Sequence, residues 1–188
     1  MQLAVDRELL DVLFMFSRWA LWSTCGLEEL GIDMEKSVFA DCVNTQVALL
    51  RAGKPLEAFD QFFAGDGIMF ANDALFATGA AEGRRKQVPF IASAASIDGA
   101  ITDVKIIDDL QVCVFRNKTS FCTAEGVPHR IDGMCWQQWS DGKITEERYY
   151  DGNRMRLLIT QGILRNPDMM IEDYRRSKLD GQGALAHA

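Results

Sequence analysis

The chain has 188 residues, a hydrophobic content of 48% and a formal net charge of −7. This apolar content is enough for a buried core, which excludes a wholly disordered chain, and the length suits one domain with an appended arm. The acidic excess argues against a nucleic acid partner, because phosphate recognition needs clustered Lys and Arg.

The cysteines and the N-terminal apolar stretch bear on compartment and cofactors. The five cysteines lack the paired spacing of metal or redox motifs, and the chain has two histidines. We therefore expect free thiols in the cytoplasm, no metal site and no cofactor. Residues 7 to 27 are apolar but interrupted by Asp11, Ser17 and Arg18. This stretch is too polar for a transmembrane span, so we expect no membrane partner. We expect instead a helix that is buried against the body of the protein or against a partner chain. The alternative is a lid over a pocket.

Helical patterns dominate the segment that follows. Apolar residues recur at helical spacing over 33 to 52, and Pro55 suits the first turn of a second helix that reaches Phe63. We predict a short strand over 68 to 71, a loop over 72 to 81 and a helix over 82 to 96, in which Pro89 marks a kink or the true start. Further helices are predicted over 154 to 164 and 168 to 178, before a frayed tail.

Four apolar runs of alternating polarity lie at residues 101–107, 110–123, 129–139 and 143–151. Asp-Asp, Glu-Gly and Asp-Gly pairs separate them, and such period-2 runs joined by turn residues predict an antiparallel meander. One face of the meander must be covered, and the preceding helices can cover it. The predicted fold class is therefore α+β.

The order of these elements resembles the SnoaL-like family of the nuclear-transport-factor-2-like superfamily, which includes polyketide cyclases, ketosteroid isomerases and limonene epoxide hydrolases. The most specific match is the turn and strand Asp141-Gly-Lys-Ile-Thr-Glu-Glu-Arg-Tyr-Tyr-Asp151. The resemblance implies a curved antiparallel sheet that forms a cone, with helices closing a mostly apolar pocket. It divides the chain into an N-terminal helical extension (1–37), the cone domain (38–152) and C-terminal helices with a frayed tail (153–188).

The resemblance also implies which residues face the pocket. It places these candidates on four strands: Phe70 and Asn72; Arg116 and Lys118; His129, Ile131, Cys135 and Gln137; Glu147 and Tyr149. A one-residue shift would turn a whole set to the other face, and a bulge in the last strand could bring Glu147 or Asp151 inward. Met134 and Trp136 fall on the outer face, where the family implies a homodimer.

The chain departs from the named enzymes of the family. Arg116 matches limonene epoxide hydrolases, but Lys118 stands where an acid belongs and Tyr149 replaces their second acid, which argues against epoxide hydrolysis. Ketosteroid isomerases need an aspartate where this chain has Cys135. Glu147 with Arg116 is either an acid–base site or a structural ion pair. For His129, next to Pro128, an exposed structural role is favoured.

We therefore expect a cofactor-free acid–base enzyme, a cyclase, isomerase or dehydratase, that acts on an apolar carbonyl-containing small molecule. Tyr149 and Arg116 would polarise the oxygen, Glu147 or His129 would move the proton, and Asn72 would orient substrate or water. The alternatives are a binding protein for a small hydrophobic ligand, without turnover, and a dimeric assembly protein that uses the N-terminal helix and the outer sheet face.

Overall fold

The computed structural model describes residues 34 to 171. The chain divides between Glu35 and Lys36 into two units, and all described residues except the first two belong to the second. The helix predicted over 7–27, most of the N-terminal extension (1–37), the continuation of the last helix to 178 and the tail lie outside the described residues. Within these limits, no helix is long and apolar enough to cross a membrane.

Helices precede, interrupt and follow the strands. The helices are α2 (Met34–Arg51), α3 (Pro55–Phe62), α4 (Ala80–Ala92) and α5 (Gly152–Gln161), with a short 3₁₀ turn, η1 (Asp108–Leu110). Pro55 begins α3, as predicted, and Pro89 lies inside α4. The helix predicted over 154–164 begins earlier, at Gly152, and ends earlier, at Gln161; Gly162 follows it with a φ of 100°, which favours glycine.

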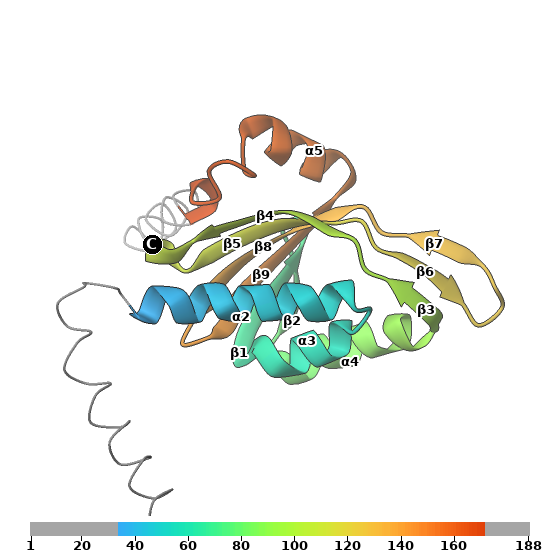
Figure 1. The fold of residues 1–188 in the computed structure, drawn as a ribbon. Coiled ribbons are helices and arrows are strands. Elements are labelled where there is room, and N and C mark those ends of the chain that lie inside the picture. The colour runs from blue at the N-terminus through green and yellow to red at the C-terminus, as the bar shows by residue number, and fades with distance from the viewer. Residues whose placement is uncertain (1–33, 172–188) are drawn as a thin grey trace, which may run out of the picture. The chain divides into compact units, whose positions relative to one another are not determined.

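The strands of the described chain form two sheets (Figure 1). The larger sheet has the order β2-β1-β9-β8-β5-β4, formed by β1 (Phe63–Ala71), β2 (Ala74–Thr78), β4 (Ile101–Ile107), β5 (Val112–Asn117), β8 (Gly133–Ser140) and β9 (Lys143–Asp151). The smaller sheet has the order β3-β6-β7, formed by β3 (Ala94–Asp98), β6 (Ser120–Thr123) and β7 (Pro128–Arg130). The predicted α+β class and curved sheet under helices are confirmed; β1 and β9 pair in parallel, so the larger sheet is mixed.

Two of the predicted runs each contribute to both sheets. The run 110–123 leaves the larger sheet after Asn117, and the run 129–139 enters it at Gly133. The chain also bends between β3 and β4, at Gly99. A Cβ atom at Gly99 would lie 1.9 Å from the carbonyl oxygen of Leu50, near the end of α2. Only glycine allows this close approach of helix and bend.

Two predictions in this region are wrong. The predicted loop over 72–81 contains β2, because Asn72 (φ 48°) and Asp73 (φ 69°) form a tight left-handed turn that joins β1 to β2. The helix predicted to reach residue 96 ends at Ala92, and β3 begins at Ala94. β3 pairs with β6, so sheet pairing rather than local helical pattern decides the conformation there.

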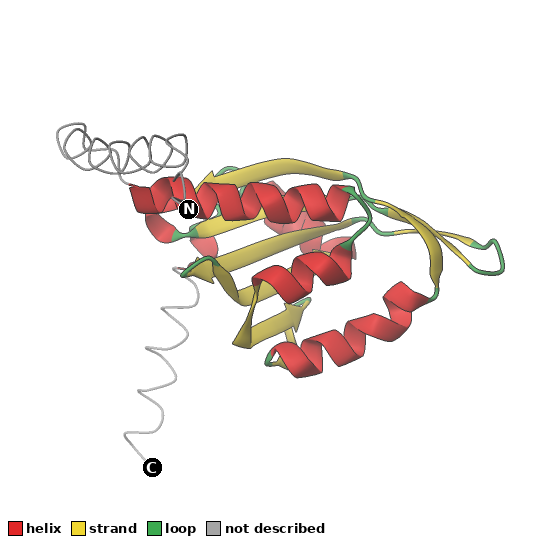
Figure 2. Cartoon of the chain, turned by 60° about the horizontal axis from the view of Figure 1, so that its bottom comes forward, coloured by secondary structure: helices red, strands yellow, loops and turns green. Residues whose placement is uncertain are grey.

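Apolar side chains pack on both faces of the larger sheet. On the inner face, α2 and α3 bury Phe39, Val43 and Phe62 against Trp139 and Ile144. Each large side chain that is fully buried contributes about 1.5–3 kcal/mol. Figure 2 shows these helices lying across that face.

The outer face of the larger sheet is covered by the chain itself. Met134, Trp136 and Tyr150 pack against Met155 and Leu158 of α5, and the cluster continues to residue 171. The indole Nε1 of Trp136 donates a hydrogen bond to the carbonyl oxygen of Pro167, at 2.8 Å. The apolar surface from which we expected a homodimer is therefore not free at Met134 and Trp136.

Candidate functional site

An apolar cavity of about 380 Å³ lies between the inner face of the larger sheet and helices α2, α3 and α4. This volume falls within the range of small-molecule sites. Aromatic and aliphatic side chains, among them Phe59, Met69, Phe115 and Ile144, form most of its wall. The few polar groups that reach this wall therefore decide what chemistry the cavity can support.

Three cross-strand rows form the inner face where β5, β8 and β9 run side by side. They are Cys113–Gln137–Glu147, Phe115–Cys135–Tyr149 and Asn117–Gly133–Asp151. A bulge at Thr145 lets Ile144 and Glu147 both face inward, since Trp139 pairs with Ile144 whereas Gln138 pairs with Glu146.

Gln137 holds the carboxyl group of Glu147 in place. The fully buried amide accepts hydrogen bonds at Oε1 from the Trp139 indole (3.2 Å) and the Cys113 thiol (3.3 Å). Because an indole N–H can only donate, this contact fixes the orientation of the amide. Its Nε2 then donates to Glu147 Oε2, at 2.7 Å.

Glu147 has no cationic partner among the described residues. Burial raises the pKa of its carboxyl group, and the single hydrogen bond from Gln137 opposes this effect. Its side chain lines the cavity and remains partly accessible there. A carboxyl group in such surroundings can accept and return a proton nearer neutral pH than an ordinary glutamate.

Tyr149 and Asn117 bring two hydrogen-bond donors to one end of the cavity. A Cβ atom at Gly133 would lie 2.3 Å from Tyr149 Oη, so the ring occupies the space that this glycine leaves open. Burial raises the pKa of Tyr149 to about 12, so its hydroxyl stays protonated at neutral pH. Asn117, paired with Gly133, accepts from Thr119 N (3.1 Å) and Oγ1 (2.6 Å) through Oδ1, which leaves its Nδ2 group without a hydrogen bond within the described residues.

The sequence matches no family model and no curated protein, whereas the fold is similar to solved structures. A candidate SnoaL-like polyketide cyclase from Jannaschia sp. CCS1 aligns with a TM-score of 0.51 and 9% identity, over 69% of this chain and 93% of that chain. The candidate hydroxylase AclR from Streptomyces galilaeus aligns with a TM-score of 0.51 and 11% identity, over 64% of this chain and 92% of that chain. The chain has a SnoaL-like, nuclear-transport-factor-2-like fold.

Six of the candidate site residues line the cavity of this SnoaL-like fold: Phe70, Ile131, Cys135, Gln137, Glu147 and Tyr149. Phe70 lies at the border of the cavity, and the centroid of its ring is 4.5 Å from Cζ of Arg148. The side chain of the neighbouring Met69 belongs to the inner core. Burial raises the pKa of the Cys135 thiol well above its usual value. A neutral thiol there packs as an apolar group and is a poor nucleophile.

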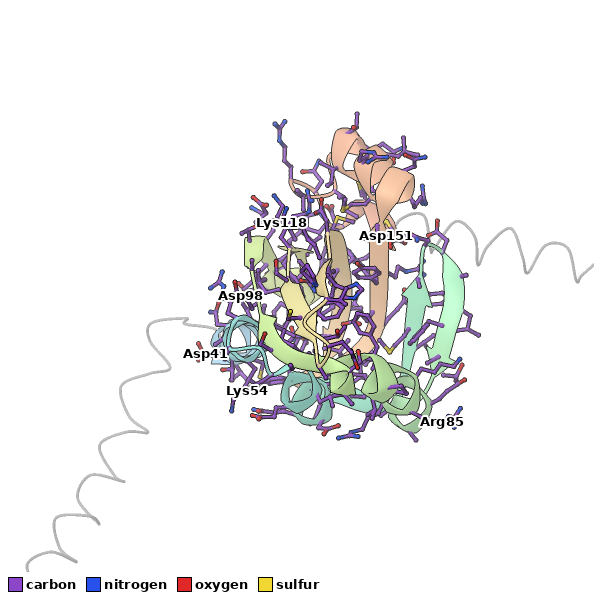
Figure 3. All side chains as sticks on the ribbon, turned by 90° about the vertical axis from the view of Figure 1, so that its right-hand side faces the viewer. Asp41, Lys54, Arg85, Asp98, Lys118 and Asp151 are labelled. Atoms are coloured by element: carbon purple, nitrogen blue, oxygen red, sulfur yellow. The ribbon has the colours of Figure 1, made fainter. Side chains whose placement is uncertain are left out.

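Arg116 and Lys118 do not face the cavity. The inward and outward faces of β5 are exchanged relative to the prediction, so Phe115 and Asn117 point inward instead. Arg116 pairs with Asp132 and donates from Nε to the carbonyl oxygen of Gly133, at 3.3 Å. Lys118 is exposed at the surface (Figure 3). The structure therefore contains no Arg116–Glu147 ion pair, and the expected inward positions of these two cations are wrong.

His129 and Asn72 also lie off the cavity wall. His129 is exposed on β7, in the smaller sheet, and its ring stacks on Phe121 with centroids 4.9 Å apart. Asn72 forms two hydrogen bonds with Asp151. The Nδ2 group of Asn72 donates to Oδ1 of Asp151 at 2.8 Å, and the backbone N–H of Asp151 donates to Oδ1 of Asn72 at 3.1 Å. Asn72 thereby ties the turn after β1 to the end of β9.

Sequence reasoning missed four polar residues of the cavity wall, which are Gln46, Gln87, Asn117 and Thr119. The sequence pattern could have identified Asn117, because it lies on the opposite face of the strand from Arg116 and Lys118, which were predicted to face inward. Gln46 lies on α2 directly after Asn44 and Thr45, and no motif around it marks it as a wall residue. Among the described residues, no group of three or more His, Cys, Asp or Glu side chains could hold a metal ion.

Proposed function

We propose that this protein is a cofactor-free acid–base enzyme that acts on an apolar carbonyl-containing small molecule as a cyclase, isomerase or dehydratase. The observation that carries the proposal is the carboxyl group of Glu147, which lines an apolar cavity with Gln137 as its only hydrogen-bond partner among the described residues. The candidate polyketide cyclase with this fold supports the choice of carbonyl substrates.

In the proposed reaction, Glu147 removes a proton from the carbon next to the substrate carbonyl. The electron pair of the broken C–H bond moves into the enolate, whose oxygen accepts hydrogen bonds from Tyr149 Oη and Asn117 Nδ2. Glu147 then returns the proton to another carbon in an isomerisation or to a departing oxygen in a dehydration. In a cyclisation the enolate carbon attacks a second carbonyl carbon of the same molecule, and Glu147 returns the proton to the oxygen of that group. Gln137 positions the carboxyl group throughout. Asn117 thus takes the role first expected of Arg116, and Glu147 alone takes the proton-transfer role shared with His129.

Binding without turnover is the second candidate. The observation that favours it is the wall itself, in which apolar side chains predominate and, among the described residues, a single carboxyl group faces the cavity. Arg116 and His129, two of the four side chains expected to do chemistry, lie elsewhere. A passive pocket needs only the apolar wall and a few orienting groups.

Solvent exchange separates the two candidates. Wild type should catalyse exchange of the α-protons of α-tetralone, an apolar cyclic ketone, with deuterium from the solvent, followed by NMR. Glu147→Gln should slow this exchange at least about 100-fold, because general acid–base catalysis contributes 10²–10⁴-fold. Thermal-shift titration should show that the variant still binds the ketone.

Glu146→Gln is the matched control. Glu146 is the neighbouring carboxylate on the outer face of β9, where it pairs with Arg148 and does not line the cavity. The exchange rate should be unchanged in this variant. Equal rates for wild type, Glu146→Gln and Glu147→Gln, with ketone binding retained, would favour the passive binder.

A further inference from the structure

The side chain of Gln46 is a buried amide in the wall of the cavity. It comes from α2, opposite the strands that carry Glu147 and Tyr149, and its exposed fraction is 4%. Its Oε1 atom is fully buried and has no hydrogen-bond partner in the part of the chain that the structure describes. The amide of Gln137, in contrast, uses both of its ends.

An unpaired buried oxygen destabilises the free protein. The neighbouring inward positions of α2, Val43 and Val47, are apolar and buried, so helix packing alone would favour an apolar residue at position 46 as well. A polar group at such a position is explained if something that enters the cavity binds it. Because the unpaired atom is an acceptor, the complementary group on that molecule is a donor.

We infer that Gln46 Oε1 accepts a hydrogen bond from a hydroxyl group of the bound molecule, so that the substrates are hydroxylated carbonyl compounds. Helix α2 lies over the inner face of the larger sheet (Figure 2), so the hydroxyl and the carbonyl contact opposite walls. The position of the substrate carbonyl in this assignment rests on the proposed function. The contact between Gln46 and a hydroxyl group requires only that the cavity binds a ligand.

Three α-tetralones test the assignment by equilibrium binding: the parent ketone, the derivative with a hydroxyl group at the far end of the aromatic ring, and its methyl ether. Wild type should bind the hydroxy compound about tenfold or more tightly than the other two, because only it can donate to Oε1. In Gln46→Met, which keeps the side-chain length, the three affinities should agree within about twofold.

Gln87→Met is the matched control. Gln87 is another glutamine of the cavity wall, but its Nε2 already contacts Met69 Sδ at 3.5 Å. The preference for the hydroxy compound should survive in this variant. If wild type binds the three compounds equally, or binds none of them, the assignment of Gln46 is overturned.

A measurement on the free protein adds a second criterion. Removing an unpaired acceptor should raise the melting temperature of Gln46→Met by about 2–4 °C. A lower melting temperature would mean that the amide is already satisfied without a ligand, which would also overturn the assignment. Neither measurement depends on turnover. Failure of the proposed function would be seen as equal exchange rates in wild type and Glu147→Gln, so it can be distinguished from failure of the Gln46 assignment.

Discussion

At the scale of single residues, the carboxyl group of Glu147 links the cavity to stability. Burial raises its pKa above the ordinary value of 4.5, so ionisation costs more in the folded state than in the unfolded state. Below about pH 4.5 both states hold the proton, and the cost is absent. As the pH rises from there through the folded-state pKa, wild type loses stability.

Glu147→Gln should therefore gain stability relative to wild type as the pH rises. The measurement is the free energy of unfolding of both proteins by urea at about pH 4 and about pH 8. The difference between the proteins at each pH removes the contribution of groups that titrate equally in both. A difference that stays constant, or that shifts in favour of wild type at the higher pH, would contradict the raised pKa.

At the scale of elements, α5 stabilises the unit by covering the outer face of the larger sheet. Adjacent residues of this helix offer a matched pair, because Leu158 is 3% exposed and Leu157 is 48% exposed. Leu158→Ala should lower the free energy of unfolding by about 2–5 kcal/mol, through lost burial and the cavity that remains. Leu157→Ala should change it by about 0.5 kcal/mol or less. Urea denaturation of the two variants checks this, and equal losses would mean that α5 is not the cover.

The strands show what alternation in a sequence can and cannot predict. Period-2 patterns predicted the run 143–151, which is β9, and the turn at Asp141–Gly142 that precedes it. The same pattern continues through the bends after Asn117 and before Gly133, so two runs were each predicted as one strand. The turn at Asn72–Asp73 carries a usable signal, because Asn and Asp tolerate positive φ better than most residues.

Alternation also divides a strand into two faces without saying which one is inside. On β9 the inward face includes Glu147 and Tyr149, whereas on β5 the opposite choice placed Arg116 inward in place of Phe115. The wall residues on helices are harder still, since a glutamine such as Gln46 differs little from a solvent-facing residue until the packing of α2 is known. The register and the packing of separate elements are long-range properties, which local patterns do not contain.

At the scale of the whole unit, the larger sheet separates two hydrophobic cores and belongs to both. Cys113 contributes to the inner core and its neighbour Val114 to the outer core. Trp139 and Trp136 divide in the same way, three residues apart on β8. Because the same strands carry both cores, we expect the inner and outer cores to unfold together in one cooperative transition.

The four tryptophans of the chain make this cooperativity measurable. With Trp19 and Trp22 replaced by Phe, Trp136→Phe leaves a fluorescence probe of the inner core, and Trp139→Phe leaves a probe of the outer core. Within each protein, the urea midpoint from fluorescence should agree with that from far-ultraviolet circular dichroism to about 0.2 M. If the outer-core probe changes at a lower urea concentration than the circular dichroism, α5 and its contacts detach first. The cavity side of the sheet would then be the independently stable part, and ligand binding should persist after the outer core has opened.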